Sequence, residues 1–523
     1  MYIIYTISLL LNFALYYDAA KILVVIPTPS LSHQVVFYPL TQELAKRGHE
    51  VTVITTDPAF TKGEAPPNLT EIDIHDTYKI VQKEIVAVKI GSGESICDQM
   101  NIIYNILSKS FEKGVQSDEV KNLLQYNEDY FDLLMIEAVV KPALIFSHFF
   151  KAPVISISSL GALMDGGAPV HPLLYPSMNQ YKLYNLNIWD KIIQLYNAFQ
   201  LKILEEDYET INNVLLRNIF GPKVPTLQEL TKNIDMTFLN VHPIWIDNQP
   251  MPPNFIFLGG LHNAEYTQGI TKNNKIQKKK ELPQILKSYL DSSKHGVVYM
   301  SLGTNIQLSQ LGSQTLDMFF NVFSELPYNF VVKCDMENKS HPKNVKLVKW
   351  VPQSNLLKHP KVKLFITQCG LQSTDEAIVA GVPVIGIPMF ADQFYNSEKY
   401  FKHKIGLKYE IKCLRADLLK NAIKTVIEDE SYRKNVIRLR SLMYDKPQTS
   451  LERAIWWTEH VLRHGGAKHL RTSAANVFWP EYFELDLVLI LLVIILSLVG
   501  LICVIIYYIC KFVSKQIMNN KEE

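Results

Sequence analysis

A tract in the last third of the chain, from Phe365 to Glu376, combines residue types that suit an anion-binding site. The apolar run from Lys363 to Ile366 predicts a buried parallel strand, and Cys369-Gly370 predicts a tight turn after it. Ser373 and Glu376 have the spacing of a capping box, which predicts that a helix begins at Ser373. Free N–H groups at a helix start can hold an anion, so a phosphate-linked sugar could bind here.

A second group with chemical potential is the triplet Ser32-His33-Gln34, which follows the first expected strand. An imidazole at the carboxyl end of a strand can remove a proton from a hydroxyl near neutral pH. The alternative is a loop histidine or a helix cap, and the residues alone favour that structural role.

The tract and its continuation resemble the signature of the UDP-glycosyltransferase family, with the spelling of the insect branch. One departure is Gln368, where many members carry His. The resemblance implies the GT-B architecture, in which two Rossmann-like, doubly wound α/β domains face a cleft. It also implies a UDP-sugar as co-substrate. The signature positions occupied in this chain are Thr367, Gly370, Ser373, Glu376, Pro383, Pro388, Asp392 and Gln393.

For the acceptor side, the resemblance assigns His33 as the catalytic base that deprotonates the acceptor hydroxyl. Family members pair this base with an Asp in a Phe-Asp-x-x-x-x-Asp frame, and here the frame that starts at Phe131 ends at Glu137. A carboxylate at this position can orient the imidazole and stabilise its protonated form. Glu137 is expected in this role, and Asp132 is the alternative.

For the donor side, the resemblance implies that Trp350 stacks on uracil and that Gln353 adds hydrogen bonds, although core packing is the alternative for any single Trp. Gln368 and Gln372 stand where His and Asn are common. Glu376 is expected to bind ribose hydroxyls, with helix capping as its alternative role. The remaining donor-binding residues expected at the phosphates, the helix start and the sugar are Ser301, Thr304, Gly370, Ser373, Asp392 and Gln393.

Composition and motifs narrow the alternatives. The chain has no Asp-x-Asp triplet, so we expect a metal-independent reaction with no bound cofactor. No G-x-G-x-x-G follows either opening strand, which argues against an oxidoreductase, and Gly91-Ser-Gly93 is wrongly placed for that role. The net charge of +2 gives no reason to expect nucleic acid, and Lys278-Lys279-Lys280 is interpreted as a solvated loop. The six cysteines lack zinc spacing.

Two apolar segments indicate the compartment. Residues Ile3 to Tyr17 predict a secretory signal peptide, with an uncleaved anchor as the alternative. Residues Leu487 to Cys510 carry no charge and predict a transmembrane helix.

The charges beside the second segment indicate its orientation. Lys511 and Lys515 follow it directly, so the positive-inside rule predicts a cytosolic tail and lumenal catalytic domains. A single-pass type I protein of the endoplasmic reticulum membrane is therefore expected. The glycosylation sequons at Asn68 and Asn338 agree with a lumenal domain.

The elements that must position these residues alternate between strands and helices. The run Lys21–Ile26, a helix ending at Lys46-Arg47-Gly48 and the run His49–Thr55 predict a βαβ unit. A Pro-rich bridge from His242 to Gly260 separates this domain from a second alternating series. The expected segments are a signal peptide (1–19), an acceptor-binding domain (20–250), a UDP-sugar-binding domain (251–445), helices packing back on the first domain (446–484), a transmembrane helix (485–510) and a cytosolic tail (511–523).

The expected function is inverting transfer of a hexosyl group from a UDP-sugar to a hydroxyl of a small lipophilic acceptor, as in conjugation or detoxification. UDP-glucose is favoured because Gln249 stands where glucuronate-using relatives commonly carry Arg, and no Lys or Arg lies between Phe365 and Ser397. UDP-glucuronate use and a non-catalytic ligand-binding protein on the same fold are the alternatives. Residues 85–125 and 160–220 are expected to shape the acceptor pocket. The acceptor itself and the oligomeric state, a homo-oligomer included, are left open.

Overall fold

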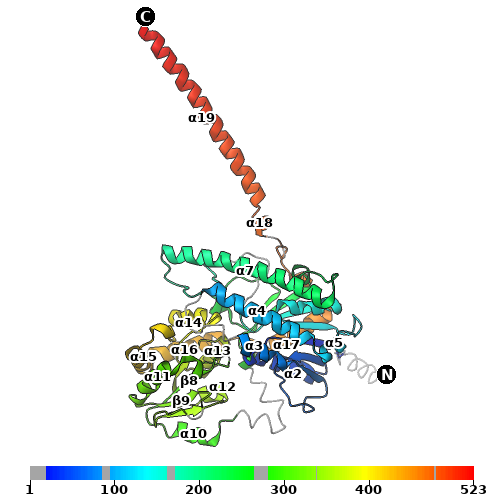
Figure 1. Ribbon diagram of the computed structural model, residues 1–523, viewed down its shortest axis with the longest axis vertical. Helices are drawn as coiled ribbons and strands as arrows, with labels where there is room; N and C mark the ends of the chain where they lie inside the picture. The colour runs from blue at the N-terminus through cyan, green and yellow to red at the C-terminus, as the bar shows by residue number, and fades with distance from the viewer. Residues whose placement is uncertain are drawn as a thin grey trace, which may run out of the picture. The chain divides into compact units, whose positions relative to one another are not determined.

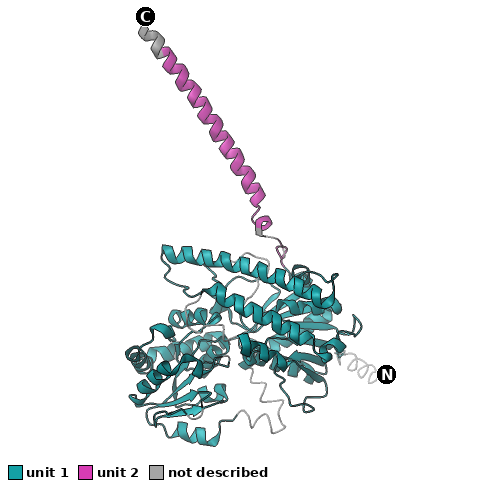
Figure 2. Ribbon diagram, in the orientation of Figure 1, with its two compact units in different colours: residues 1–163, 170–471 teal, residues 164–169, 472–523 magenta. Residues whose placement is uncertain are grey.

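The computed structural model describes residues 19–84, 95–161, 171–178, 180–263, 281–304, 306–336, 339–475, 477 and 479–522. The chain divides into two units, 1–163 with 170–471, and 164–169 with 472–523 (Figure 2). The expected signal peptide, apart from residue 19, and the sequon at Asn338 lie outside the described residues, as do Gly91-Ser-Gly93 and Lys278–Lys280.

The first unit contains a seven-stranded, wholly parallel sheet with the order β3-β2-β1-β4-β5-β6-β7. Its central strands are buried along nearly their whole length, as expected for a sheet covered by helices on both faces. The strands are β1 (Lys21–Ile26), β2 (Glu50–Thr55), β3 (Leu69–Asp73), β4 (Leu133–Glu137), β5 (Val154–Ser158), β6 (Ile234–Leu239) and β7 (Phe255–Phe257). The last strand lies beyond residue 250, so the first sheet continues past the domain boundary expected there.

The same unit contains a second parallel sheet of six strands, in the order β10-β9-β8-β11-β12-β13. Its strands are β8 (Val297–Ser301), β9 (Asn329–Lys333), β10 (Val345–Val348), β11 (Val362–Thr367), β12 (Val384–Gly386) and β13 (Gly406–Lys408). In both sheets the strand order reverses beside the first strand of the series, which is where doubly wound folds bind ligands. The prediction of two doubly wound domains is therefore confirmed.

Helices connect the strands and cover both sheets (Figure 1). Those of the first domain are α2 (Leu31–Lys46), α3 (Tyr78–Glu84), α4 (Ile96–Val115), α5 (Asp118–Leu123), α6 (Phe146–Phe149), α7 (Ile188–Phe220) and α8 (Leu227–Thr231). Those of the second domain are α10 (Gln284–Asp291), α11 (Ser313–Ser324), α12 (Gln353–Leu357), α13 (Leu371–Ala380), α14 (Asp392–Lys402), α15 (Ala416–Glu428) and α16 (Glu430–Tyr444).

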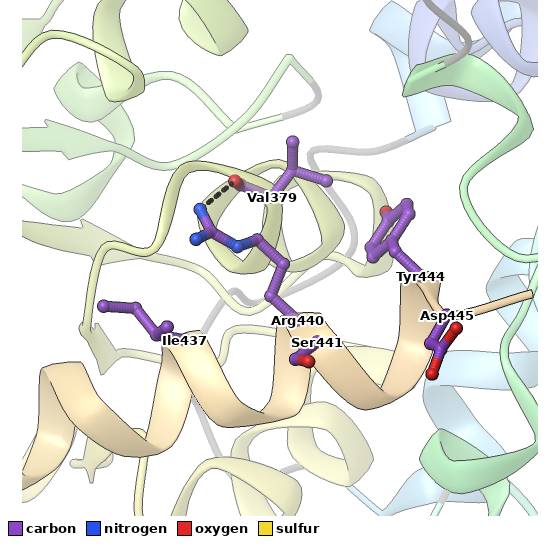
Figure 3. Close-up of a pocket in the computed structure, with 6 residues that line it drawn as sticks. All are labelled: Val379, Ile437, Arg440, Ser441, Tyr444 and Asp445. Carbon is purple, nitrogen blue, oxygen red and sulfur yellow. Dashed lines mark hydrogen bonds between the residues drawn. The ribbon is translucent and has the colours of Figure 1, made fainter.

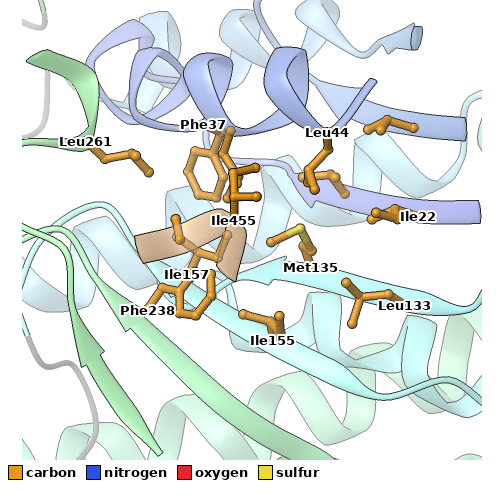
Figure 4. Close-up of a cluster of buried hydrophobic side chains, with 14 of the residues drawn as sticks. Ile22, Phe37, Leu44, Leu133, Met135, Ile155, Ile157, Phe238, Leu261 and Ile455 are labelled. Carbon is orange, nitrogen blue, oxygen red and sulfur yellow. The ribbon is translucent and has the colours of Figure 1, made fainter. Parts of the chain in front are cut away.

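One helix near the end of the first unit, α17 (Ser450–His464), returns to the first domain. Its Ile455 packs in the same buried cluster as Phe37 of α2 and Ile157 of β5 (Figure 4). An ion pair supports this packing, because Arg47 Nη1 lies 2.9 Å from Glu459 Oε1. The chain therefore completes the first core only after it has built the second domain.

Two helix starts differ from the sequence-based expectation. Helix α2 begins at Leu31, so His33 lies in its first turn and not in the preceding loop. Helix α13 begins at Leu371 with Gly370 as its N-cap, and the capping box expected from Ser373 and Glu376 is not formed. The turn itself lies at Cys369-Gly370 as expected, since Cys369 has a φ of 72° in the left-handed region, and the helix begins directly after it.

The second unit contains α18 (Trp479–Tyr482) and the long apolar helix α19 (Leu485–Glu522). By length and composition, the stretch Leu485–Gln516 could cross a membrane.

Candidate active site

The predicted base and its carboxylate meet at the carboxyl edge of the first sheet. His33 Nδ1 lies 2.9 Å from Oε1 of Glu137, the last residue of β4. The Glu137 side chain is fully buried, and its Oε2 accepts a 3.3 Å hydrogen bond from the N–H of Thr28. The alternative residue, Asp132, accepts instead from the N–H of Lys21 at the opposite edge. Glu137 is thus the carboxylate that the fold brings to His33.

A serine that the sequence did not reveal completes this group. Ser159 follows β5, is fully buried, and places its Oγ 2.8 Å from His33 Nδ1. Because both contacts fall on Nδ1, the second ring nitrogen, Nε2, is the one free to face a substrate. Gln34 fixes the start of α2, since its Nε2 donates to the carbonyls of Ile26 and Thr28.

In the second domain, Gln353, Ser373 and Glu376 form one hydrogen-bonded group. Gln353 Nε2 donates to Ser373 Oγ at 2.9 Å and to Glu376 Oε2 at 2.6 Å. The hydroxyl of Tyr299, in β8, donates to Gln353 Oε1 at 3.1 Å. Burial raises the pKa of Glu376 to about 7, although the hydrogen bond from Gln353 opposes this rise. Three of the predicted donor-binding residues therefore lie together.

Trp350 lies just after β10, and 57% of its surface is exposed. An indole in the core would be buried, so the core-packing alternative for this residue is excluded. Its exposed ring remains available for stacking on a flat ligand.

The turn after β8 gathers the residues expected near the phosphates. Ser301 ends the strand, and its Oγ accepts from the N–H of Gly303 at 3.3 Å. The carboxamide of Gln368 lies against Gly303, where a Cβ would fall 2.1 Å from Gln368 Nε2. Gln368 Oε1 is buried and has no hydrogen-bond partner among the described residues. Thr304 lies exposed at the end of this turn.

A cation at the same turn was missed by the sequence analysis. Lys333 ends β9, and its Nζ donates to the Gly303 carbonyl at 2.8 Å. Burial lowers the pKa of this ammonium group below its ordinary value. A basic residue at the carboxyl end of a buried strand is the signal that could have identified it.

Asp392 and Gln393 begin α14, the helix that follows β12. Burial raises the pKa of Asp392 to about 6, while a hydrogen bond from Asn396 and the charge of His33 oppose this rise. Gln393 Oε1 accepts from the N–H groups of Met389 and Phe390, which fixes the turn before the helix. His33 belongs to the first domain and Asp392 to the second, so the proposed site draws on both domains.

Gln372 bridges the two domains, although it was expected to bind the donor. Its Nε2 donates to the Ser159 carbonyl at 3.0 Å, and its own carbonyl lies 3.3 Å from His262 Nε2. Gly370 caps the same helix, α13. The structure thus brings the signature helix directly beside the His33 group.

A separate surface hollow of about 520 Å³ lies between α13 and α16 (Figure 3). Arg440 on α16 crosses toward α13, where its Nη1 donates to the Val379 carbonyl at 3.1 Å. None of the predicted site residues lines this hollow, so it is not where they act.

Comparisons with known proteins identify the family of the chain. A family model described as UDP-glucoronosyl and UDP-glucosyl transferase matches residues 20–522. An ecdysteroid UDP-glucosyltransferase of Spodoptera littoralis nuclear polyhedrosis virus is 35% identical over 498 residues, covering 92% of this chain and 95% of the viral protein. UDP-glucosyltransferase 2 of Dactylopius coccus is 30% identical over 506 residues, which cover 94% of this chain and 93% of the insect protein.

Solved structures extend the likeness of the fold. The glycotransferase of kitacinnamycin superposes with a TM-score of 0.54 at 18% identity, covering 84% of this chain and 98% of that one. The spinosyn forosaminyltransferase SpnP superposes with a TM-score of 0.56 at 16% identity, covering 85% of this chain and 100% of SpnP. At these identities the likeness concerns the fold alone.

Two doubly wound domains, with a polar cluster at their sheet edges, have the GT-B fold. The chain belongs to the UDP-glucoronosyl and UDP-glucosyl transferase family and is a UDP-glycosyltransferase.

Proposed function

We propose that this enzyme transfers a glucosyl group from UDP-glucose to a hydroxyl of a small lipophilic acceptor. His33 Nε2 removes the proton of the acceptor hydroxyl, and the oxygen forms a bond to the anomeric carbon. The bond between that carbon and the UDP oxygen breaks, so UDP leaves with the electron pair and the configuration inverts. The proton remains on His33 until solvent takes it.

The observation that carries this proposal is the 2.9 Å contact between His33 Nδ1 and Glu137 Oε1. A buried carboxylate on Nδ1 keeps the proton on that nitrogen and leaves Nε2 with its lone pair toward the substrate. Once Nε2 gains a proton, the same carboxylate stabilises the imidazolium ion. General base catalysis of this kind contributes about 10²–10⁴-fold in rate.

The leaving diphosphate needs positive charge. We assign this role to Lys333 together with the N–H groups at the start of α13 and the residues around Gly303. Trp350 offers a stacking surface for uracil, and Glu376 accepts from ribose hydroxyls. These groups supply the electrostatic stabilisation from the chain's own residues.

A neutral sugar fits the residues assigned to the hexose. Asp392 and Gln393 are hydrogen-bonding partners for hydroxyl groups. The nearby lysines of α14 are already engaged, since Lys399 and Lys402 both pair with Asp247. The relatives named UDP-glucosyltransferases favour the same donor. UDP-glucuronate remains the competing donor.

The acceptor class follows from the relatives and from the anchor. Several relatives are named for ecdysteroids, which makes an ecdysteroid the first acceptor to test. With α19 across a membrane and Lys511 on its cytosolic side, the catalytic domains lie in the lumen of the endoplasmic reticulum. Lipophilic acceptors that partition into this bilayer would then be close to the enzyme.

Turnover by the purified full chain tests the proposal. UDP release and product mass are measured with UDP-glucose and UDP-glucuronate, each with an ecdysteroid and with one phenolic acceptor. We expect a higher kcat/KM for UDP-glucose, and a loss of about 10²–10⁴-fold in kcat for His33→Ala with UDP binding retained. A higher kcat/KM for UDP-glucuronate would refute the donor, and normal turnover by His33→Ala would refute the mechanism.

A further inference from the structure

The long helix α7 exposes a continuous apolar surface over its first four turns. Trp189 is 70% exposed, and its neighbours on the same side are also large, apolar and exposed. We call the set the α7 face, and it consists of Trp189, Ile192, Ile193, Tyr196, Phe199 and Ile203. Its spacing of three and four residues places these side chains on one side of the helix.

The opposite side of α7 is the buried one, and it is partly polar. Gln194, Tyr208 and Asn212 are buried there beside Leu201 and Leu216. A helix on the surface of a water-soluble domain normally turns its apolar side inward and its polar side outward. The first half of α7 has the reverse arrangement, so an apolar environment outside the domain is needed to cover it.

Charges interrupt the apolar side of α7 after Ile203. Glu206 and Asp207 lie exposed there one turn later, and apolar side chains resume beyond them, since Ile211 is 61% exposed and Val214 is 53% exposed. Lys191 and Lys202 are exposed along one border. A short apolar stripe with Trp and Tyr and a lysine border matches the composition of helices that lie in a membrane interface.

The position at which the chain leaves the first domain indicates that the partner of the α7 face is a membrane. The first unit ends at Arg471, whose Nη1 donates to the Lys232 carbonyl at 2.6 Å, directly after α8. Helix α8 in turn is fastened to α7, because the N–H of Leu227 donates to Asn213 Oδ1 at 2.7 Å. The chain therefore leaves the first domain beside the C-terminal part of α7.

Only residues 472–484 separate that exit from the apolar helix α19. Thirteen residues span at most about 45 Å when fully extended. Helix α7 itself is about 50 Å long at 1.5 Å per residue. A linker of this length permits α7 to reach the bilayer that α19 is proposed to span.

We propose that the α7 face lies in the interface of the bilayer that α19 spans, with its apolar side chains among the headgroups and upper acyl chains. The proposal rests on the proposed membrane anchoring by α19. Helix α7 also stacks on α4 through Tyr208 and Tyr104, whose ring centroids are 4.3 Å apart, so the docked helix is a wall of the acceptor domain. A lipophilic acceptor would then leave the bilayer beside the domain that binds it.

Photolabelling of the full chain in phosphatidylcholine vesicles tests the proposal. A phospholipid with a diazirine on its acyl chain is activated by light, and labelled peptides are identified by mass spectrometry. We expect adducts on peptides from residues 188–203 as well as on those from α19. The double substitution Ile192→Glu with Phe199→Glu is expected to reduce the α7 adducts at least tenfold and to leave the α19 adducts unchanged.

The matched control is Ile285→Glu on α10, because Ile285 is 75% exposed and lies outside the α7 face. It should change neither set of adducts, and all variants should keep the wild-type melting temperature. Label on α19 without label on α7 would overturn the docking proposal while the anchor stands. Label on neither helix would overturn both. A dimer in light scattering that only the α7 variant abolishes would show that a second copy covers this face.

Discussion

Asn396 Nδ2 donates a 2.8 Å hydrogen bond to Asp392 Oδ2, one helical turn away on α14. The Asn396 Oδ1 atom accepts from the buried indole N–H of Trp245, also at 2.8 Å. This contact joins the segment between β6 and β7 of the first domain to the carboxylate proposed to bind the sugar. Asn396 is thus a positioning residue for Asp392.

We expect Asn396→Ala to lower kcat/KM for UDP-glucose by about tenfold, the worth of a hydrogen bond to a charged group. The hydrogen bond favours ionised Asp392, so its loss should raise the Asp392 pKa above about 6. The decrease should therefore be larger at pH 6 than at pH 8 in a pH profile. Asn435→Ala on α16, which removes a bond to the Lys404 carbonyl, is the matched control. A uniform decrease at every pH would contradict the role in positioning.

Substitutions around His33 should separate orientation from binding. Glu137→Gln keeps the shape but removes the charge that stabilises the imidazolium, so kcat should fall by about 10²–10⁴-fold. Ser159→Ala removes a neutral partner of Nδ1, and a loss of about tenfold is expected. Calorimetric titration with UDP should give unchanged affinity for both variants. A Glu137→Gln enzyme with normal kcat would refute the proposed pair.

A buried ion pair links α14 to the segment between β6 and β7. The Lys399 side chain is fully buried and lies 2.7 Å from Asp247 Oδ2, and Lys402 contacts the other oxygen. Burial alone would raise the Asp247 pKa, but hydrogen bonds from both lysines lower it below its ordinary value. Asp247→Asn leaves the Lys399 ammonium without a counter-charge, and we expect a destabilisation of about 3–5 kcal/mol.

The pH dependence of that loss has a definite sign. A depressed folded pKa contributes stability above the ordinary carboxyl pKa, and the contribution disappears as the pH falls through the folded value. The melting temperatures of wild type and Asp247→Asn should therefore differ most near neutral pH and converge in acid. Asp247→Asn with Lys399→Met should recover most of the stability. Asp76→Asn, which removes an exposed pair with Lys79, should change nothing.

Asp375 on α13 should make the protein less stable at alkaline pH. Burial raises its pKa to about 8, and its Oδ2 has no hydrogen-bond partner among the described residues. A raised folded pKa gives stability below the ordinary carboxyl pKa that is lost as the pH rises toward about 8. Asp375→Asn should therefore raise the melting temperature by a few degrees at pH 8.5 and have less effect at pH 5. An equal effect at both pH values would exclude ionisation as the cause.

Protease protection tests the proposed orientation. Protease added to sealed microsomes should remove only the stretch after about Lys511 and leave the rest of the chain intact. Digestion of the domain that contains His33 without detergent would show that the orientation inferred from Lys511 and Lys515 is wrong. Detergent-treated microsomes provide the control for cleavage.

The sequence predicted the strands whose patterns are simple. β1 and the end of α2 follow from an apolar run and from basic residues before Gly48, and the structure has them where expected. β6 was missed because Asp235 interrupts its apolar run. That carboxylate is buried and accepts from the N–H groups of Val154 and Ala467, which only the folded chain brings near.

The site was predictable where a motif fixes a residue and unpredictable where folding brings distant residues together. Glu137 followed from its frame, and its contact with His33 has the expected partner. The contact of Gln372 with Ser159 joins residues 213 positions apart, and no local pattern encodes it. The start of α13 was misplaced because the spacing of Ser373 and Glu376 was interpreted as a capping box, whereas the helix begins at Leu371, directly after the turn at Cys369-Gly370.

The return of α17 to the first core means that the polypeptide joins the two domains twice, once after β7 and once after α16. A body held at one point can swing in any direction, but a body held at two points turns most easily about the line between them. The enzyme should therefore open by a hinge rotation about the axis through these two connections, which would move Asp392 in the second domain relative to His33 in the first. Because α17 leads on toward α19, the proposed anchoring would hold the first domain, and the second domain with its proposed nucleotide site would be the part that turns.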